Sequence, residues 1–379
     1  MKVGVPAETG TGERRVAMVP DIVPRLTGIG LDVLIESGAG RHAYAGDEDY
    51  AAAGATVVPD VLGAADVLLT VGPLDAERAR ALLPGTMLVG LLCPSTSLEL
   101  VRTLRERGVT SFAMELVPRI SRAQAMDALS SQAMVTGYRG VLVAAERLPR
   151  FFPLSMTAAG TVPPAKVLVL GAGVAGLQAI ATARRLGAAV QAYDVRAASA
   201  EEVRSLGATF LDLDLDTMEG EGGYAREMTK DSAARQRELL APHVAASDVL
   251  ITTAGVPGRP APRLVSADMV AAMRPGSVVV DLAAASGGNC EPTRPGAEIR
   301  FGDVVVWGEL NVPSQLPVHA SQLYARNVAE LLALMTSDGD VRPDFDDEIV
   351  AGCVLTFDGE VRHQQTRALL EDAFGTEAR

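Results

Sequence analysis

The chain is 379 residues long, with 48% hydrophobic and 21% charged residues, a composition typical of a soluble globular protein with a large core. This length predicts two domains. The formal net charge is −13, from 34 basic and 47 acidic residues, and it argues against binding to nucleic acid, which requires a basic surface.

The sequence also predicts no metal site, no disulfide bond and no membrane-spanning segment. The three cysteines lie far apart and predict neither a disulfide framework nor a zinc site, and the four histidines have no spacing that suggests a metal. No signal peptide is predicted, because no sustained apolar run follows Lys2. The most apolar run, residues 167–183, is interrupted by glycines and Gln178 and is too short to cross a membrane.

The N-terminal part alternates short apolar runs with helical patterns. We expect helices over 21–30, 77–83 and 97–108, and strands over 2–5, 32–35, 66–72, 86–93 and 109–116. Such alternation predicts a mostly parallel sheet covered on both faces. A long helix is then expected over 123–147, and the prolines and small residues of 151–165 predict a boundary.

A second alternating series begins at Lys166. It contains six candidate strands, as in a complete doubly wound dinucleotide fold, at 166–170, 189–195, 208–213, 248–254, 277–283 and 304–310. The helical pattern over 314–335 is expected to return to the first domain. The predicted fold class is therefore α/β, with two doubly wound Rossmann-like domains and a cleft between them. The first domain is discontinuous (1–130 and 310–379), and the second, a Rossmann domain, covers 131–309.

A nucleotide fingerprint opens this second series. Gly171, Gly173 and Gly176 directly follow an apolar strand and start a helix, with Ala172 and Val174 between them. The first glycine permits a tight turn, the second lets the backbone approach a pyrophosphate, and the third allows close helix–strand packing. The pyrophosphate then faces the unpaired N–H groups of the helix N-terminus.

The choice of cofactor follows from the end of the next strand. Asp194 lies about 20 residues beyond the glycines, where a carboxylate accepts the ribose hydroxyls and repels the extra phosphate of NADP. We therefore predict NAD(H), with Val195 and Arg196 beside it. Arg196 is a possible ligand of a 2′-phosphate, and a purely structural strand-end aspartate is the alternative for Asp194.

Two further segments give weaker predictions. Residues 252–258 end a strand at the carboxyl edge of the sheet, where Gly255 is a candidate for cofactor binding, although a plain turn has the same composition. Residues 219–231 combine glycines, mixed charge and Tyr224. A flexible surface connection is the default for such a segment, and a mobile lid that places Tyr224 near the cofactor is the sharper hypothesis.

Several motifs together resemble one family. They are "PRISRAQAMDALSSQ" (118–132), "TAAGTVPPAKVLVLGAGVAGLQAIATARRLGA" (157–188), "YDVRA" (193–197), "GGYAREM" (222–228), "PGSVVVDLA" (275–283) and "GGNC" (287–290). The chain resembles the NAD(H)-binding alpha subunits of proton-translocating NAD(P) transhydrogenases, which share a two-domain architecture with alanine dehydrogenases. The resemblance implies Re/Si-specific hydride transfer between NAD(H) on this chain and NADP(H) on a partner subunit.

The resemblance also implies site residues and partners. Arg119, Gln124 and Asp127 would position the nicotinamide, and the remaining implied contacts with the cofactor are Ser130, Gly223, Tyr224 and Gln236. The implied assembly is a homodimer docked, on the cytoplasmic face of the cell membrane, to membrane-spanning and NADP-binding subunits that couple the reaction to proton translocation. For the 118–132 segment, a capped and salt-bridged helix start is the structural alternative.

Two other functions remain as alternatives. An alanine dehydrogenase needs a proton-transferring group and cations for the substrate carboxylate, and Arg15 stands where that family has its carboxylate-binding arginine. However, the family's lysine is absent from "LLTVGPL", Cys93 replaces its histidine, and Ala285 replaces its aspartate. The third possibility is a catalytically silent NAD sensor that binds a regulatory partner.

Overall fold

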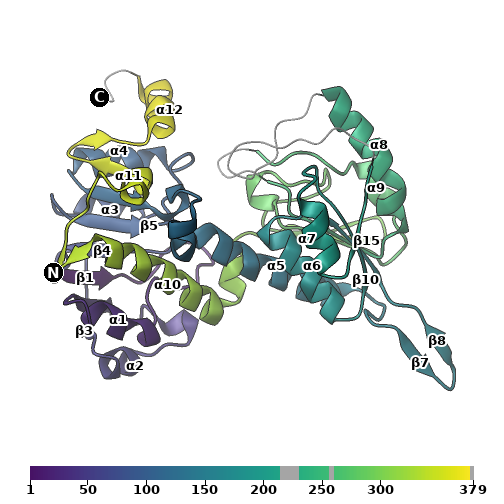
Figure 1. The fold of residues 1–379 in the computed structure, drawn as a ribbon, viewed down its shortest axis with the longest axis horizontal. Helices are drawn as coiled ribbons and strands as arrows, with labels where there is room; N and C mark the ends of the chain where they lie inside the picture. The colour runs from purple at the N-terminus through teal and green to yellow at the C-terminus, as the bar shows by residue number, and fades with distance from the viewer. Residues whose placement is uncertain (214–229, 256–259, 376–379) are drawn as a thin grey trace. The chain divides into compact units, whose positions relative to one another are not determined.

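The computed structural model describes residues 1–213, 230–255 and 260–375 (Figure 1). They form two compact units: unit 1 is Met1–Gln132 with Ser314–Arg379, and unit 2 is Ala133–Pro313. Unit 1 is thus discontinuous. Its divisions from unit 2 lie at 132/133 and 313/314, compared with 130/131 and 309/310 in the sequence prediction.

Unit 1 is built on an eight-stranded sheet. The strand order is β19-β18-β6-β5-β4-β1-β2-β3, from β1 (Lys2–Val5), β2 (Asp32–Glu36), β3 (Thr56–Val58), β4 (Val67–Leu69), β5 (Met87–Gly90), β6 (Thr110–Ala113), β18 (Val354–Phe357) and β19 (Glu360–Val361). The six strands β1 to β6 are parallel, and β18 pairs antiparallel with β6. The order of these six reverses between β1 and β4, which makes this place a topological switch point.

Helices cover both faces of this sheet (Figure 1). They are α1 (Val23–Thr27), α2 (Asp47–Ala52), α3 (Ala76–Ala81), α4 (Leu98–Glu106), α10 (Pro317–Met335), α11 (Glu348–Cys353) and α12 (Gln364–Phe374). Alternate residues of β4 enter different cores: Val67 and Leu69 join the cluster that includes α1 and α10, whereas Leu68 joins the cluster that includes α3 and α4. A strand buried on both faces explains why the sequence reads as continuous apolar runs.

Unit 2 repeats the arrangement with a seven-stranded sheet. Its order is β11-β10-β9-β12-β13-β15-β14, from β9 (Lys166–Leu170), β10 (Ala189–Tyr193), β11 (Thr209–Phe210), β12 (Val249–Thr252), β13 (Val278–Asp281), β14 (Glu298–Phe301) and β15 (Val304–Trp307). Only β14 pairs antiparallel in this sheet, as far as the described residues extend. The order reverses between β9 and β12, so the switch point lies beside the strand that precedes the glycine fingerprint.

The helices of unit 2 are α6 (Val174–Arg185), α7 (Ser199–Ser205), α8 (Lys230–Ala246) and α9 (Ala267–Ala271), together with most of α5 (Ala128–Arg147). The same alternation of buried residues occurs here. Val167 and Val169 of β9 join one core, and Leu168 and Leu170 join the other. Both predicted Rossmann-like folds are confirmed.

Two sequence predictions about local structure were wrong. The helix expected from residue 123 begins at Ala128, because Ser121–Met126 forms a 3-10 helix and the chain leaves helical geometry at Asp127, with ψ 85°. The boundary expected at 151–165 lies inside unit 2. There β7 (Ser155–Thr157) and β8 (Gly160–Val162) pair as an antiparallel hairpin that projects from the unit (Figure 1). Gly160, the first residue of β8, has φ +130°.

Candidate cofactor-binding site

The glycine turn joins β9 to α6 at the switch point of unit 2. Gly171 has φ +100°, a conformation that side chains disfavour. A Cβ atom at Gly176 would lie 1.9 Å from the carbonyl oxygen of Gly171, so only glycine permits this close approach. The Thr253 hydroxyl donates to the same carbonyl at 3.1 Å. The turn is therefore tied both to α6 and to the end of β12.

Gly173 differs from these two glycines because its surroundings are open. It is the residue preceding α6, with φ −77°, and a Cβ atom there would have no other atom within 4 Å. The space in front of a helix N-terminus accepts an anion, since the first N–H groups of the helix lack partners within it. This open position fits the pyrophosphate of a dinucleotide. Val174 beside it is exposed, and Ala172 is buried.

Asp194 follows β10 and lies against the glycine turn. Its carboxylate accepts hydrogen bonds from the backbone N–H of Ala172 at 2.7 Å and of Arg196 at 2.9 Å, and from Nε and Nη2 of Arg196 at 2.8 Å each. Burial alone would raise the pKa of Asp194, but the bonds from Arg196 and Ala172 outweigh burial and lower it. Asp194 is therefore a carboxylate at neutral pH, and its hydrogen bond from Ala172 ties the end of β10 to the glycine turn.

The remaining residues of unit 2 that were predicted to bind the cofactor lie outside the glycine turn. Val195 is partly buried beside Asp194, and Gly255 is exposed shortly after β12. Gln236, on α8, is 1% exposed, and its side-chain amide donates to the Tyr193 hydroxyl at 3.0 Å. The structure thus gives Gln236 a buried partner within the unit. Gly223 and Tyr224 lie outside the described residues.

The polar run of residues 118–132 belongs to unit 1. Arg119 and Gln124 are exposed, and the Asp127 carboxylate accepts from the backbone N–H of Ser130 at 2.8 Å and from its hydroxyl at 2.6 Å. Asp127 therefore caps the first turn of α5, which was the structural alternative for this residue. The proposed contacts of Arg119, Gln124, Asp127 and Ser130 with a nicotinamide stay a prediction.

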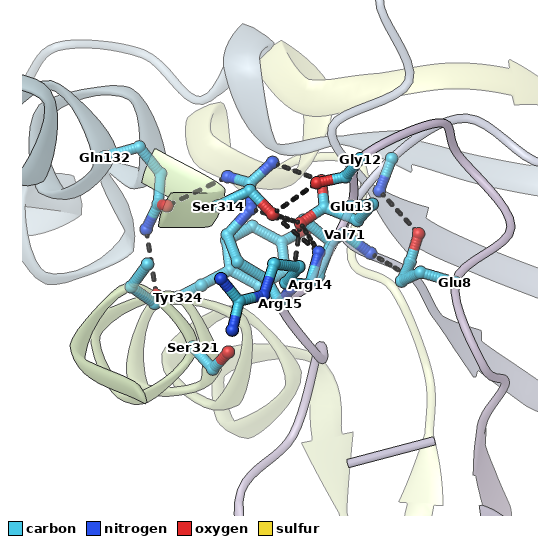
Figure 2. A network of polar contacts seen from close by, with 12 residues as sticks. Glu8, Gly12, Glu13, Arg14, Arg15, Val71, Gln132, Ser314, Ser321 and Tyr324 are labelled. Atoms are coloured by element: carbon cyan, nitrogen blue, oxygen red, sulfur yellow. Dashed lines mark hydrogen bonds and ion pairs between the residues drawn. The ribbon is translucent and has the colours of Figure 1, made fainter. Parts of the chain in front are cut away.

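A buried ion pair in unit 1 involves an arginine that the sequence had linked to carboxylate binding (Figure 2). Nε and Nη2 of Arg15 donate to the two oxygens of Glu13 at 2.8 and 2.6 Å, and Nη1 donates to Gln132 at 2.9 Å. The exposed fractions of the Arg15 and Glu13 side chains are 8% and 7%. Arg15 therefore directs its donor fork to groups within the protein instead of presenting it to a substrate.

The same network holds the C-terminal part of the chain in unit 1 (Figure 2). The Ser314 hydroxyl donates to Glu13 at 2.9 Å and accepts from the backbone N–H of Arg14 at 2.5 Å. Gln132 donates to the carbonyl oxygen of Ala320 at 3.1 Å. Since these residues are up to 301 positions apart, the network helps to explain why unit 1 is discontinuous. No local sequence pattern predicts that Ser314 bonds to Glu13 or that Gln132 bonds to Arg15.

Cys93 stands where an alanine dehydrogenase would have its histidine. It has φ +50°, and its backbone N–H donates to Glu115 at 2.5 Å. Desolvation, aided by the negative charge of Glu115, raises the pKa of the Cys93 thiol to about 11. The thiol is therefore protonated at neutral pH, and it is poorly suited to transfer a proton to or from an amino acid. Ala285 is exposed and carries no functional group.

Glu8 occupies the switch point of unit 1. Its carboxylate accepts from the backbone N–H groups of Val71 at 2.5 Å and Gly72 at 3.2 Å, directly after β4. These donors at the carboxyl edge of the sheet are the kind that bind an anionic ligand in other open sheets. Here a side chain of the protein fills that position. Desolvation outweighs these two bonds and raises the pKa of Glu8 from 4.5 to about 7.

We expect this carboxyl group to make the stability of the protein depend on pH. The pKa of Glu8 is higher in the folded chain than in the unfolded chain. Its contribution to the free energy of unfolding is therefore complete below about pH 4.5 and is lost as the pH rises through about 7. The loss amounts to at most about 3 kcal/mol. Urea unfolding of the wild type and Glu8→Gln at several pH values measures it. The wild type should lose stability relative to the variant between pH 5 and 8, and parallel profiles would contradict the prediction.

Gly137 is a residue that sequence reasoning missed, although a glycine inside a helix is a visible signal. It lies on α5, where a Cβ atom would be 2.1 Å from the carbonyl oxygen of Ala175 in the first turn of α6. Gly140 is a turn further along α5, and a Cβ atom there would meet only side-chain atoms of Leu282, at 3.0 Å or more. Gly137 thus allows α5 to approach the start of the fingerprint helix.

Alanine at position 137 is therefore expected to displace the start of α6. We predict a loss of about 1–3 kcal/mol of stability and at least a tenfold loss of NADH affinity, because the N–H groups that face the phosphate would move. The Gly140→Ala variant is the matched control and should lose much less of both. Thermal unfolding and titration of NADH fluorescence measure the two effects. Equal behaviour of the two variants would contradict this role for Gly137.

The described residues contain neither a membrane span nor a metal cluster. No helix within the described ranges is long and apolar enough to cross a membrane. Among the same residues, no group of three or more histidine, cysteine, aspartate or glutamate side chains is placed to hold a metal ion.

Comparison with protein families gave matches to both parts of the chain. Residues 4–136 match the N-terminal domain of the alanine dehydrogenase/PNT family, and residues 140–364 match its C-terminal domain. The second match extends beyond unit 2 into the C-terminal part of unit 1.

Individual proteins resemble the chain over most of its length. The first part of the NAD(P) transhydrogenase subunit alpha of Rhodospirillum rubrum is 45% identical, covering 96% of this chain and 98% of that protein. The alanine dehydrogenase of Mycobacterium tuberculosis is 35% identical, covering 84% of this chain and 82% of that protein. The crystal structure of a transhydrogenase from Sinorhizobium meliloti superposes with a TM-score of 0.85 at 42% identity, covering 96% of this chain and all of that one.

Proposed function

Because the chain belongs to the alanine dehydrogenase/PNT family, we propose that it is the NAD(H)-binding alpha subunit of a proton-translocating transhydrogenase. It passes hydride between NAD(H) on this chain and NADP(H) on a partner subunit. The observation that carries the proposal is the glycine turn at the switch point of unit 2, with the Asp194 carboxylate held against it. This arrangement supports recognition of a dinucleotide with a free ribose diol.

The residues of unit 2 fit the cofactor. The open side of Gly173 and the N-terminus of α6 would receive the pyrophosphate, and Asp194 would accept from the ribose hydroxyls. Arg119, Gln124, Asp127 and Ser130 would orient the nicotinamide carboxamide through their donors and acceptors. When bound, the nicotinamide rings supply the hydride chemistry, and the side chains position them rather than act as acid or base.

Two observations favour this function over oxidation of alanine. The donor fork of Arg15 is taken up by Glu13 and Gln132, and the Cys93 thiol is protonated at neutral pH. A substrate carboxylate would therefore lack this cation, and Cys93 would not replace the histidine as a base. The similarity to the transhydrogenase subunit of R. rubrum is also higher than that to the alanine dehydrogenase of M. tuberculosis.

The proposed assembly rests on the resemblance to a transhydrogenase subunit alpha, a name that implies further subunits. The chain forms a homodimer on the cytoplasmic face of the cell membrane, held by membrane-spanning and NADP-binding subunits. Those partners carry the proton translocation that is coupled to hydride transfer.

Reconstitution tests the proposal. The purified chain is mixed with the NADP-binding subunit of a transhydrogenase, and reduction of an NAD analogue by NADPH is followed by absorbance. Turnover is expected only when both proteins are present. Formation of NADH from alanine and NAD by the chain alone would indicate an alanine dehydrogenase instead. Binding of NADH without turnover in the mixture would indicate a sensor.

A further inference from the structure

The contacts of Asp194 leave no open position on its carboxylate. A carboxylate offers about four lone-pair positions. Oδ1 accepts from the backbone N–H and Nε of Arg196, and Oδ2 accepts from the backbone N–H of Ala172 and from Nη2 of Arg196. The two hydroxyls of a ribose therefore cannot bind Asp194 unless some of these four donors leave.

Among these donors, the guanidinium of Arg196 is the one that can leave without moving the main chain. The backbone donor of Ala172 belongs to the glycine turn, and that of Arg196 to the segment that follows β10. The Arg196 side chain is 22% exposed, compared with 7% for Asp194, so it covers the carboxylate and is itself partly in contact with solvent. A ribose diol also has two O–H donors side by side, so it matches the two N–H donors of the guanidinium.

We infer that Arg196 is a specificity-determining residue, which the ribose of NAD(H) displaces from Asp194. The inference rests on the proposed function, because it concerns the same cofactor site. Displacement costs two charge-assisted hydrogen bonds, so Arg196 lowers the affinity for NAD(H).

Arg196 acts in the opposite direction on NADP(H). An unpaired Asp194 would repel the 2′-phosphate, whereas the pair of Asp194 and Arg196 has no net charge. Once displaced, the guanidinium is a cation with the planar geometry that binds phosphate in bidentate fashion. Arg196 therefore reduces the ratio by which the site binds NAD(H) more tightly than NADP(H).

Removing the guanidinium group of Arg196 tests this inference. We expect Arg196→Met to bind NADH about 3- to 10-fold more tightly, because Asp194 is then open to the ribose. The same variant should bind NADPH at least about tenfold more weakly, because the carboxylate is unpaired and the cation is gone. Titration of the fluorescence of each reduced nucleotide measures both affinities.

The control is Arg185→Met, which removes the same charge from the exposed last turn of α6. It should change neither affinity by more than about twofold, because it is an exposed charge that salt screens. Arg196→Lys keeps the charge without the fork, so it should tighten NADH binding yet retain NADPH binding. This variant also serves if Arg196→Met does not fold.

The outcomes are distinguishable. Opposite shifts of the NADH and NADPH affinities support the inference, since a merely structural role would weaken both. Equal or weaker binding of NADH by the Met and Lys variants would overturn it. Absence of NADH binding by the wild type would overturn the proposed function itself.

Discussion

Alanine in place of Gly176 is expected to abolish measurable binding of NADH, with an affinity loss of at least about 100-fold. The added Cβ atom would lie 1.9 Å from the carbonyl oxygen of Gly171 and 3.1 Å from the hydroxyl of Thr253. The first contact is with backbone, so the start of α6 must move away from the turn. The N–H groups at the helix N-terminus then no longer converge on one point. Titration of NADH fluorescence measures the loss.

Alanine in place of Gly173 is the informative control. No atom lies within 4 Å of its added Cβ atom, and its φ of −77° suits any residue. The melting temperature should therefore stay within a few degrees of that of the wild type. If the pyrophosphate approaches this position, NADH affinity should nevertheless fall at least about tenfold. Unchanged affinity in Gly173→Ala would place the phosphates elsewhere.

The second large effect is expected on stability, from Arg15→Met. This substitution leaves Glu13 as a buried carboxylate without its counter-ion, since the Glu13 side chain is 7% exposed. Breaking a buried pair in this way costs about 3–5 kcal/mol. Urea unfolding measures the change. The double variant with Glu13→Gln should lose clearly less than Arg15→Met alone, because the unpaired charge is gone while an oxygen acceptor remains for Ser314 and the backbone.

This prediction also separates two roles for Arg15. If Arg15 bound a substrate carboxylate, as an alanine dehydrogenase requires, Arg15→Met would leave stability nearly unchanged. Affinity for pyruvate would then be present in the wild type and absent from the variant. A stable Arg15→Met protein would therefore contradict the structural role given to the pair.

The parts of the fold that depend on local sequence were predicted well. The glycine turn, α6 and the strand that ends before Asp194 lie within about 30 residues, as expected of one βαβ unit, and each has its own signal in composition. Apolar runs also placed the central strands, because a strand buried on both faces needs no alternation. Short edge strands such as β14 and β19 escaped prediction, because they have few residues and are only partly buried.

The contacts within the site were harder to predict from the sequence, because each polar side chain has several possible hydrogen-bond partners. Asp127 caps α5 rather than lying within it, and periodicity alone does not locate such a break. The partners of Arg15 come from residues 13, 132 and, through Glu13, 314. Only the packed fold brings them together. Arg196 is two residues from Asp194, yet the bidentate bond between them depends on the backbone geometry after β10.

The most direct measurement is the path of an isotope label. NADPH carrying deuterium at the transferable position of its nicotinamide is supplied with an NAD analogue, this chain and the NADP-binding subunit of a transhydrogenase. The proposed function predicts that the reduced NAD analogue carries the deuterium, as detected by mass spectrometry, and that none forms when this chain is omitted. A mixture that binds both nucleotides but transfers no deuterium to the analogue would contradict it.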